Sequence, residues 1–506
     1  MQEEQTESEK TAPAAQASDP ITEKLLSWNA SICTFVCKLL LSWKTGLRTL
    51  FADEEEGDYN LMRYFIGMLS LILFIALTMV GYVSVKEGKT EFKPVITEPG
   101  KQCIDCHVKK GITAGAIRDW KMSEHAAKGI GCNECHIPVE STPQRIQAMT
   151  TVCEDKNVRL DVSSANCKGC HEEKVAEFAR GKHSKAWLAM EVMPTTKDQP
   201  PEIIDGEKGC GGCHKIGRDE GQCDACHTRH KFSAEEARRP EACATCHMGF
   251  DHPQWEMYST SKHGMIYAME GDNWDFSKKI KEWNENPFEP SSSTPRAPVC
   301  VTCHMQDGDH GVMTAWGFLA LRLPEDDKEW MGYRTKILEG LGITLSTSEG
   351  TRRIKDIVVS GDMARLTKEG WQEQRNKMIK VCAQCHSESW GKGELDKADR
   401  IIKAADKLMA EAIEIVEGLY TDGLLPKPEN YPPHVDLLRF YEVQTAIEQK
   451  LYVMFLEHRM RTFQGAFHNN PDYMHWYGWA EMKRDLAEIR EENKNLRAKH
   501  AQAAEK

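Results

Sequence analysis

One pattern, Cys-x-x-Cys-His, occurs eight times between positions 103 and 386 and constrains this chain more than any other feature. Two cysteines three positions apart can form thioethers with the two vinyl groups of a haem, and the histidine that follows can bind its iron. With 19 cysteines and 19 histidines in 506 residues, chance predicts only about 0.03 such motifs. Zinc also binds paired Cys-x-x-Cys units, but zinc sites do not require a histidine after every second cysteine. The spacing therefore predicts a c-type cytochrome with eight covalently bound haem groups.

The motifs supply sixteen predicted thioether cysteines: Cys103, Cys106, Cys132, Cys135, Cys167, Cys170, Cys210, Cys213, Cys223, Cys226, Cys243, Cys246, Cys300, Cys303, Cys382 and Cys385. The histidines that complete the motifs are predicted iron ligands: His107, His136, His171, His214, His227, His247, His304 and His386. Eleven other histidines could supply the second axial ligands: His125, His183, His230, His252, His263, His310, His434, His458, His468, His475 and His500. Because eleven candidates serve at most eight irons, this count leaves open whether one iron keeps a position for substrate.

Composition predicts a mainly helical haem domain over 98–395, with much coil and little strand, because strand signals are scarce and the macrocycles fill interior volume. The net charge of −12, without a basic tract, argues against nucleic acid. Over 396–506 we expect a helical bundle that could form an oligomer contact. Its apolar spacing predicts one helix over 401–419 that ends near Gly423 and Pro426, a second from about 435 to 467, and a charged third from about 480.

The N-terminal part has the composition of a membrane-associated segment. Residues 1–20 are predicted to be disordered. Residues 21–56 predict an amphipathic helix that lies on the membrane or docks on a membrane partner; a second spanning segment is the alternative, although Asn29 and Lys38 interrupt it. Within 61–86, Tyr64 to Val85 is a run of 22 uncharged residues, which predicts one transmembrane anchor. Lysines and arginines precede it, so we expect a cytoplasmic N-terminus and a periplasmic haem domain, the side on which bacteria attach haem.

From position 209 to 264 the sequence reads GCGGCHKIGRDEGQCDACHTRHKFSAEEARRPEACATCHMGFDHPQWEMYSTSKHG. This segment resembles the hydroxylamine oxidoreductase family of octahaem cytochromes. Weaker similarity covers the rest of the haem domain and GAFHNNPDYMHWYGWAEM at 465–482, whereas the first 95 residues lie outside it. The resemblance implies that the fourth haem, held by Cys210, Cys213 and His214, is the catalytic one.

The same resemblance assigns roles to residues outside the motifs. Asp251 and His252 match the distal pocket of the catalytic haem, and a histidine beside a carboxylate suits proton transfer at neutral pH. The distal ligands of the other haems match His125, His183, His230, His263, His310 and His468. His230 follows His227 too closely to reach the same iron, so it serves a neighbouring haem or none.

Six histidines would then serve seven haems. Where the family places another ligand, shortly before the third motif, this chain has Cys153, its only cysteine outside a motif on the haem side. One hypothesis is that Cys153 binds an iron as a thiolate. The alternative is a buried thiol, with His434, His458 or His475 as the seventh ligand.

The resemblance also bears on the direction of the reaction. Oxidative family members link a tyrosine near the C-terminus to the catalytic porphyrin, but the matching position here is His475 or Trp476, with Tyr473 and Tyr477 nearby. Where oxidative members have a pocket tyrosine after the seventh motif, this chain has Phe318 or Leu319.

These departures favour reduction of nitrite to nitric oxide, hydroxylamine or ammonia. The alternatives are oxidation of hydroxylamine or hydrazine, and a non-catalytic multihaem electron conduit. A quinol-oxidising membrane complex is the expected redox partner, and the family usually forms homotrimers.

Overall fold

The computed structural model describes residues 67–79, 93–144, 147, 151–153, 156–192, 196, 199–204, 208–250, 252–284, 293–312, 323–341, 368–427, 435–438 and 445–505. The chain divides into two compact units, Met1–Thr90 and Glu91–Lys506. In the first unit, residues 67–79 form a helix, which is the described part of the predicted anchor. No helix among the described residues is both long enough and apolar enough to cross a membrane. The predicted segments 1–20 and 21–56 lie outside the described residues.

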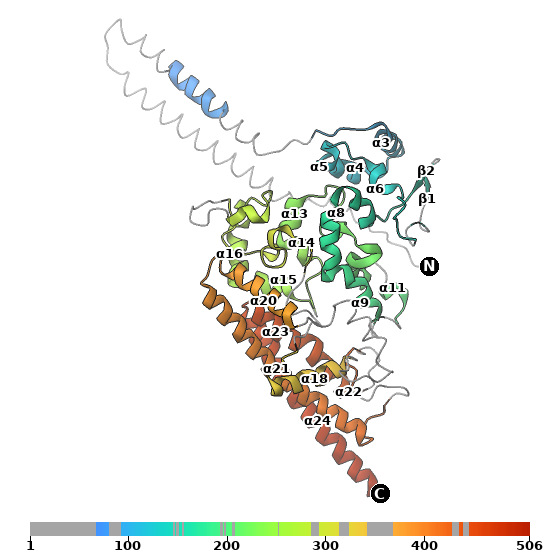
Figure 1. The fold of residues 1–506 in the computed structure, drawn as a ribbon, viewed down its shortest axis with the longest axis vertical. Helices are drawn as coiled ribbons and strands as arrows, with labels where there is room; N and C mark the ends of the chain where they lie inside the picture. The colour runs from blue at the N-terminus through green and yellow to red at the C-terminus, as the bar shows by residue number, and fades with distance from the viewer. Residues whose placement is uncertain are drawn as a thin grey trace, which may run out of the picture. The chain divides into compact units, whose positions relative to one another are not determined.

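In the second unit, residues 98–312 carry the first seven motifs on short helices joined by turns (Figure 1), and we call them the motif region. Its elements are α3 (Glu98–Lys110), α4 (Ala114–Lys121), α5 (Glu124–Ala127), α6 (Cys132–His136), β1 (Thr151–Cys153), β2 (Lys156–Val158), α8 (Ser164–Arg180), η1 (Lys182–Lys185), α9 (Ala186–Val192), α11 (Pro201–Ile204), α12 (Gly211–His214), η2 (Lys215–Glu220), η3 (Cys223–Ala225), α13 (Ala234–Arg238), α14 (Pro240–Ala244), α15 (Gln254–Ser259), α16 (Lys262–Glu270), η4 (Gly271–Asn273), η5 (Ile280–Asn284), α17 (Cys300–His304) and η6 (Gln306–Gly308). The strands β1 and β2 pair antiparallel, with Cys153 opposite Lys156. The predicted mainly helical fold with little strand is confirmed.

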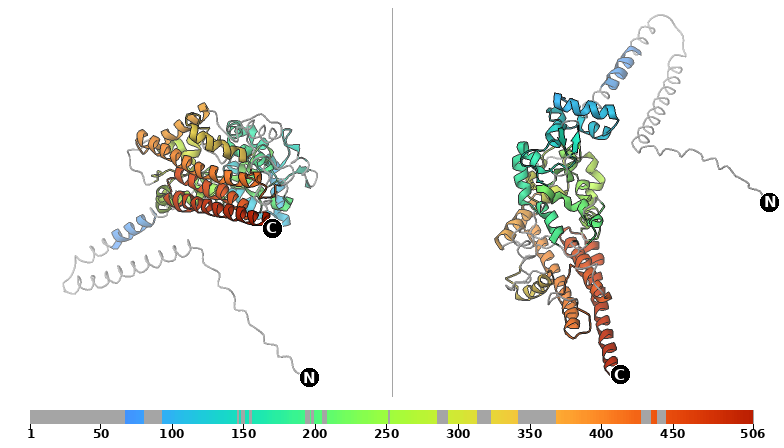
Figure 2. Two further views of the ribbon diagram at one scale, coloured as in Figure 1. Left: turned by 90° about the horizontal axis from the view of Figure 1, so that it is seen from below. Right: turned by 90° about the vertical axis from the view of Figure 1, so that its right-hand side faces the viewer.

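Longer helices follow the motif region. They are α18 (Lys328–Gly340), α20 (Lys368–Cys382), α21 (Glu388–Thr421), α22 (Ala446–Val453), the π-helical η8 (Met454–Arg459), α23 (Met460–Phe467), the π-helical η9 (Asp472–Ala480) and α24 (Glu481–Ala504). Helix α21 packs against α18, α23 and α24, and α23 packs against η9 (Figure 2). We call α18 and α21 to α24, with η8 and η9, the C-terminal bundle.

Local sequence explains the bounds of α21. The Ser387 hydroxyl accepts a hydrogen bond from the Trp390 N–H at 3.2 Å and so caps the first turn. The helix ends at Thr421, and Gly423 follows with a φ of 70°, a conformation that glycine adopts without strain. Its buried residues recur every three or four positions, as Ala405, Leu408 and Ala412 do, so one face of the helix is apolar. The prediction for 401–419 is confirmed, and the helix also extends N-terminally to Glu388.

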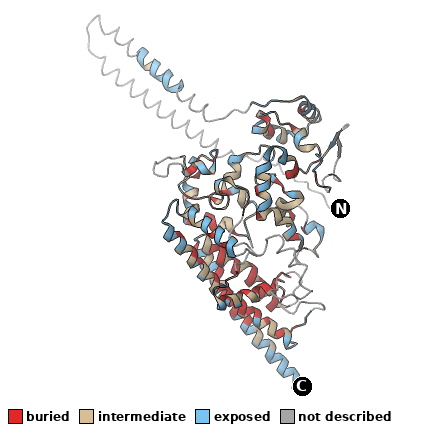
Figure 3. Ribbon diagram, in the orientation of Figure 1, coloured by how far each residue is buried: buried red, intermediate tan, exposed pale blue. Residues whose placement is uncertain are grey.

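The main hydrophobic core lies in the C-terminal bundle, where buried residues are concentrated (Figure 3). Ile337 of α18, Ile413 of α21, Phe455 of η8 and Leu486 of α24 are all at most 1% exposed. The motif region has smaller apolar clusters, such as an aromatic one around Phe276 between α15, α16 and α17. The bundle therefore resembles an ordinary globular core, and the motif region does not.

A buried charge cluster joins three helices of the bundle. The fully buried carboxylate of Asp406 accepts hydrogen bonds from Trp330 Nε1 at 2.7 Å, from Arg334 Nε at 2.8 Å and from Arg459 Nη2 at 2.7 Å. Burial disfavours the charge, but the two guanidinium groups outweigh it and hold the pKa of Asp406 below its usual range. Because an unpaired buried charge is costly, this cluster fixes α18, α21 and η8 relative to one another.

The other two predicted helices begin at positions different from those expected. Residues 435–438, where a helix is predicted to begin, are not helical, and α22 begins at Ala446, where Thr445 and Glu448 form a capping box. The helix predicted from about 480 is already helical from Asp472, through the π-helical η9. The predicted boundary between 395 and 396 falls within α21.

Candidate haem-binding and catalytic sites

The motifs fold into single helical turns that bring their cysteines and histidine together. In the fourth and sixth motifs the N–H of His214 or His247 donates to the carbonyl of the first cysteine, at 3.0 and 2.9 Å. Residues three apart on a helical turn lie on the same face, so both sulfurs can reach the same edge of one macrocycle. The motif sequence thus encodes the local geometry that two thioether bonds require.

The six histidines predicted as distal ligands each lie opposite a different motif histidine. The ring centres are separated by 6.2 Å for His125 and His171, 6.1 Å for His230 and His136, 5.9 Å for His183 and His247, 6.3 Å for His310 and His227, 6.4 Å for His263 and His386, and 6.5 Å for His468 and His304. Two imidazoles that bind one iron from opposite faces, with iron–nitrogen bonds of about 2 Å, have ring centres roughly 6 to 6.5 Å apart. The described residues therefore fit haem groups at the second, third, fifth, sixth, seventh and eighth motifs.

Hydrogen bonds fix the orientation of several of these rings. Four Nδ1 atoms have backbone carbonyl partners: Arg159 O for His136 at 2.7 Å, Ala186 O for His214 at 2.7 Å, Gly308 O for His310 at 3.0 Å and Gln464 O for His468 at 2.8 Å. The Gln254 side-chain oxygen lies 3.2 Å from His247 Nδ1, and the Thr113 hydroxyl 2.8 Å from His107 Nδ1. When Nδ1–H donates to such an oxygen, Nε2 is left with the lone pair that an iron requires.

Burial keeps the most enclosed of these imidazoles neutral. Burial and, after it, the facing histidine lower the pKa of His227 and of His304 to about 4. The same causes lower the pKa of His247 to about 3. A histidine must be neutral to bind a metal, so the protein prepares these rings for ligation at neutral pH.

The cysteines of successive motifs lie close together. Burial, and after it the nearby Cys103, raises the pKa of Cys132 to about 11, so the first two motifs adjoin. Side-chain hydrogen bonds join Cys167 to Cys223 and Cys243 to Cys300. Cys135 and Cys167, Cys226 and Cys243, and Cys303 and Cys382 lie near enough to influence each other electrostatically. The motifs therefore form a spatial series in the order one, two, three, five, six, seven and eight, and haem groups on it would be close enough to exchange electrons.

The fourth motif adjoins the sixth site. His214 is held by the carbonyl of Ala186, three residues after His183, which faces His247. Gly217 packs so closely on the same segment that a Cβ atom would lie 2.6 Å from the His183 carbonyl oxygen. The fourth haem would thus connect to the series at its sixth member.

His252, one member of the predicted catalytic pair, lies beside the sixth motif. The ring centre of His252 is 6.0 Å from that of His247, and His252 is half-buried, while Asp251 lies outside the described residues. A tight turn imposes this proximity, because the Trp255 N–H donates to the His247 carbonyl and the Gln254 N–H to the His252 carbonyl. His183 approaches His247 from a distant part of the chain, so we assign His183, and not His252, as its partner across the iron.

The candidates for the seventh distal ligand lie in different environments. Cys153 ends strand β1 and is half-buried. His458 is in the C-terminal bundle, with Nδ1 bonded to Asp485, which gives it a structural role there. His475 packs edge-on against Trp476 in η9, and His434 lies outside the described residues. The six ring pairs include neither His107 nor His214. Because the resemblance makes the fourth haem the catalytic one, a seventh ligand would act at the first motif.

The structure describes Tyr473 and Tyr477, two of the residues that bear on the direction of the reaction. Tyr473 and Tyr477 pack together in η9 with ring centres 5.1 Å apart, and Tyr477 is 49% exposed. Phe318 and Leu319 lie outside the described residues.

A local signal marks two of the distal histidines and could have been read from the sequence. Ser123 and Ser261 each cap a short helix, and their hydroxyls accept hydrogen bonds from the N–H groups of Ala126 at 3.0 Å and Gly264 at 3.2 Å. The distal histidine is the second residue of each helix, two positions after the serine. A serine two positions before a histidine therefore indicates a capped helix N-terminus, which fixes the direction of the imidazole.

Comparison with known proteins shows to which family the chain belongs. Residues 100–334 and 354–432 match the family described as "Seven times multi-haem cytochrome CxxCH". This chain belongs to that family of multihaem cytochromes, and its motifs bind haem c covalently.

The predicted resemblance to hydroxylamine oxidoreductases is confirmed by named relatives. The chain is 27% identical over 475 residues, 78% of its length, to a probable nitrite reductase-hydroxylamine oxidoreductase fusion protein of Kuenenia stuttgartiensis. It spans about half of that relative, 51% of its length.

Two solved structures share the fold. A reducing HAO-like protein complex of Kuenenia stuttgartiensis has a TM-score of 0.62 and 24% identity, covering 81% of this chain and 90% of that one. A hypothetical multiheme protein has a TM-score of 0.61 and 18% identity, covering 80% and 97%.

Proposed function

We propose that this chain is an octahaem enzyme that reduces nitrite, or another small nitrogen oxide, at the haem of its fourth motif. The other seven haems would deliver the electrons. The observation that carries this proposal is that the six predicted distal histidines each face a motif histidine other than His214. These six histidines are thereby committed to relay haems, which leaves the first and fourth sites, and the resemblance favours the fourth, which adjoins the series at its sixth member, for chemistry.

The residues around the fourth motif have distinct tasks in this proposal. Haem iron, when bound, supplies a centre that binds small N–O ligands and exchanges electrons with them. Cys210 and Cys213 anchor the macrocycle, and His214, oriented by the Ala186 carbonyl, holds the iron from one side. His252, which lies beside the sixth site, would donate protons at the fourth haem, and Asp251 would orient it or relay the proton.

Reduction is the favoured direction for three reasons. The position that matches the cross-linking tyrosine of oxidative members is His475 or Trp476 here. One relative is named as a probable fusion of a nitrite reductase and a hydroxylamine oxidoreductase, and a structural relative as a reducing HAO-like protein complex. A membrane anchor would also place the haem series near a quinol-oxidising complex. The product would be nitric oxide, hydroxylamine or ammonia.

The test uses the purified, haem-loaded protein with a chemical reductant. We expect nitrite to change the optical and electron paramagnetic resonance spectra, and His252→Asn to lower nitrite turnover by about 10²- to 10⁴-fold, the usual contribution of a positioned proton donor. His500→Asn, on the exposed end of α24, is the matched control and should retain full turnover. Full turnover in His252→Asn would remove its role as proton donor.

Two alternatives have their own discriminating results. Oxidation of hydroxylamine or hydrazine would be favoured if mass spectrometry found a peptide with Tyr473 or Tyr477 attached to the haem peptide of Cys210 and Cys213. A non-catalytic conduit is favoured by the continuous series of adjoining motifs. The conduit reading requires that neither nitrite nor hydroxylamine alter any spectrum.

We also propose Cys153 as the seventh distal ligand, at the first haem. A thiolate lowers the reduction potential of a haem relative to two histidines. Low-spin thiolate signals should then appear in the electron paramagnetic resonance spectrum and vanish in Cys153→Ala. A spectrum unchanged by that substitution would return the ligand to a histidine, such as His434.

The cellular setting completes the proposal. Residues 61–86 would anchor the protein, with the N-terminus cytoplasmic and the haem domain periplasmic, and the C-terminal helices would form a homotrimer. Replacement of residues 1–90 by a cleavable periplasmic signal peptide should release the protein from the membrane fraction without loss of haem. Light scattering of that released protein should give the mass of a trimer, and a monomer mass would contradict this part.

A further inference from the structure

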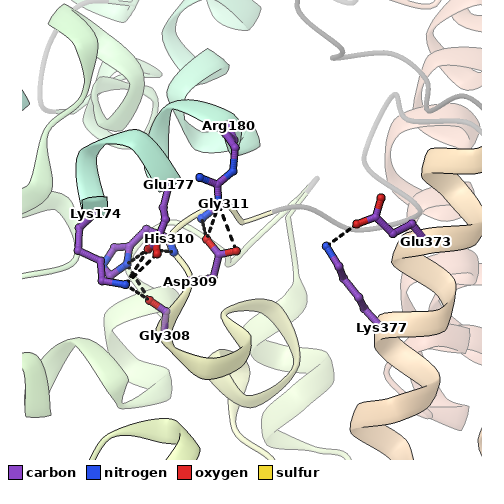
Figure 4. Close-up of polar contacts among 9 residues, drawn as sticks. All are labelled: Lys174, Glu177, Arg180, Gly308, Asp309, His310, Gly311, Glu373 and Lys377. Atoms are coloured by element: carbon purple, nitrogen blue, oxygen red, sulfur yellow. Dashed lines mark hydrogen bonds and ion pairs between the residues drawn. The ribbon is translucent and has the colours of Figure 1, made fainter. Parts of the chain in front are cut away.

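Helix α8 connects two haem sites. It carries His171 of the third motif in its N-terminal half, and its C-terminal half contacts the loop of residues 308–312, which holds His310 (Figure 4). His310 faces His227 of the fifth motif, with ring centres 6.3 Å apart. One helix thus positions a proximal ligand of the third haem and a distal ligand of the fifth.

Glu177 makes the central contacts between α8 and this loop. Its Oε2 accepts a hydrogen bond from the His310 backbone N–H at 3.0 Å and lies 3.4 Å from His310 Nδ1. Lys174 Nζ bonds both carboxylate oxygens at 2.9 Å and also the Gly308 carbonyl at 3.3 Å. The Glu177 side chain is only 11% exposed, whereas that of Lys174 is 41% exposed.

A second ion pair holds the same loop without approaching the ring. Arg180 Nη2 lies 3.3 Å from Asp309 Oδ1, which also accepts the Gly311 N–H at 2.8 Å. The loop therefore has an anchor independent of Glu177. Unlike that exposed ion pair, the Glu177 carboxylate is buried and lies beside the imidazole.

The carboxylate distinguishes His310 from the other oriented ligands. The Nδ1 partners of His136, His214 and His468 are neutral backbone carbonyls. His310 Nδ1 has two neighbouring oxygens: the Gly308 carbonyl and, in addition, the buried carboxylate of Glu177. The Lys174 ammonium and the His310 backbone N–H both bind this carboxylate and so favour its ionised form.

We propose that Glu177 is a positioning residue that orients His310 as distal ligand of the fifth haem and lowers the reduction potential of that haem. A carboxylate beside Nδ1–H makes the imidazole a stronger donor and favours the ferric state. Lys174 limits the effect, because its positive charge offsets part of the carboxylate charge. The fifth haem would then be a low-potential member of the relay, whichever direction the electrons take.

The test is a redox titration of the haem-loaded protein, followed by electron paramagnetic resonance. Glu177→Gln keeps an oxygen that can accept a hydrogen bond from the His310 backbone N–H, but it removes the charge. The midpoint potential of one haem, the fifth, should therefore shift to a more positive value. Lys174→Met removes the opposing charge, so the same midpoint should shift to a more negative potential. Glu373→Gln is the matched control, because Glu373 forms a comparable pair with Lys377 at 2.9 Å but is 64% exposed (Figure 4). All midpoints should stay unchanged in it.

The opposite signs separate this proposal from a purely structural role. If both variants shift the midpoint in one direction, or if neither shifts any midpoint, Glu177 does not set the potential. A high-spin signal in Glu177→Gln, with Lys174→Met unchanged, would also overturn it, because Glu177 would then only keep His310 in place. Should Glu177→Gln bind fewer haems by mass spectrometry, the sign of the Lys174→Met shift decides alone.

Discussion

The motif region and the C-terminal bundle are both helical, but different interactions hold them together. The bundle has a continuous apolar core shared by α18, α21, α22, η8 and α24. The motif region has helices as short as α6 and α12, whose lengths are well below those of helices stable on their own. One of its apolar clusters consists of Ile104, Trp120 and Ala126, with two partly buried neighbours. The bundle is therefore stabilised by its side chains, and we infer that the motif region, whose apolar clusters are smaller, depends in addition on its haem groups.

The largest expected effect is on protein made without haem attachment. In that form the motif region should be unfolded, because its short helices lack the contacts that the macrocycles provide. The bundle should keep its helices, since its core includes no motif residue. Limited proteolysis with mass spectrometry should cut throughout 98–312 and spare α21 to α24. The haem-loaded protein is the control. Uniform protection of the haem-free chain from proteolysis would show that the motif region does not depend on haem more than the bundle does.

The next effect concerns the bundle alone. Asp406→Asn leaves Arg334 and Arg459 buried without a counter-charge, so the free energy of unfolding should fall by about 3 to 5 kcal/mol. Urea unfolding followed by circular dichroism measures this loss, and the haem absorbance of the native protein should not change.

The matched control lies on the same helix. Glu411 pairs with Arg490 of α24 at 2.7 Å, and the two side chains are 38% and 49% exposed. Glu411→Gln should cost less than about 1 kcal/mol, because water screens an exposed pair. Equal losses in the two variants would show that burial does not set the strength of these pairs.

The pH dependence of the bundle follows from the same group. The pKa of Asp406 is lower in the folded protein than in the unfolded chain, so its contribution to stability is complete above about pH 4. That contribution is lost as the pH falls through the folded pKa, since the unfolded state then binds the proton more readily. The difference in unfolding free energy between the native chain and Asp406→Asn should therefore narrow below about pH 4. If the difference stays constant below about pH 4, the packing of the Asp406 side chain, and not its charge, would account for the stabilisation.

The sequence predicted local features of both regions and missed most contacts between distant residues. The motif spacing predicted the cysteines and proximal histidines, because one helical turn contains all the information. The apolar spacing of α21 predicted that helix, but Asp406 interrupts the pattern with an acid that is usually exposed. Its partners Arg334 and Arg459 come from other helices, so no periodicity reveals a buried cluster.

The pairing of histidines shows the same limit. Which distal histidine faces which motif could not be read from spacing, because His468 and His304 meet across the whole C-terminal part of the chain. The orienting partners of several paired histidines are backbone carbonyls, such as that of Arg159 for His136 and that of Gln464 for His468, which any residue type provides. The resemblance supplied the six distal positions, and only the three-dimensional arrangement shows their partners.

The smallest expected effect concerns a helix N-terminal cap, which occurs in both regions. Ser123 caps α5, which carries His125, whereas Thr445 caps α22 in the bundle. Loss of either hydroxyl removes a hydrogen bond at a helix N-terminus, so Ser123→Ala and Thr445→Ala should each cost about 1 kcal/mol. In the bundle this loss should appear only in urea unfolding.

In the motif region the same loss should appear in a spectrum. The first turn of α5 sets the direction of the His125 imidazole, which faces His171 with ring centres 6.2 Å apart. Ser123→Ala should therefore broaden or shift the low-spin electron paramagnetic resonance signal of the third haem, while Thr445→Ala leaves every haem signal unchanged. Unchanged signals in both variants would mean that the bond to the iron, and not the helix cap, orients His125. In that case the cofactor would shape the motif region even within a single helical turn, because metal ligation would override the local preference of the chain.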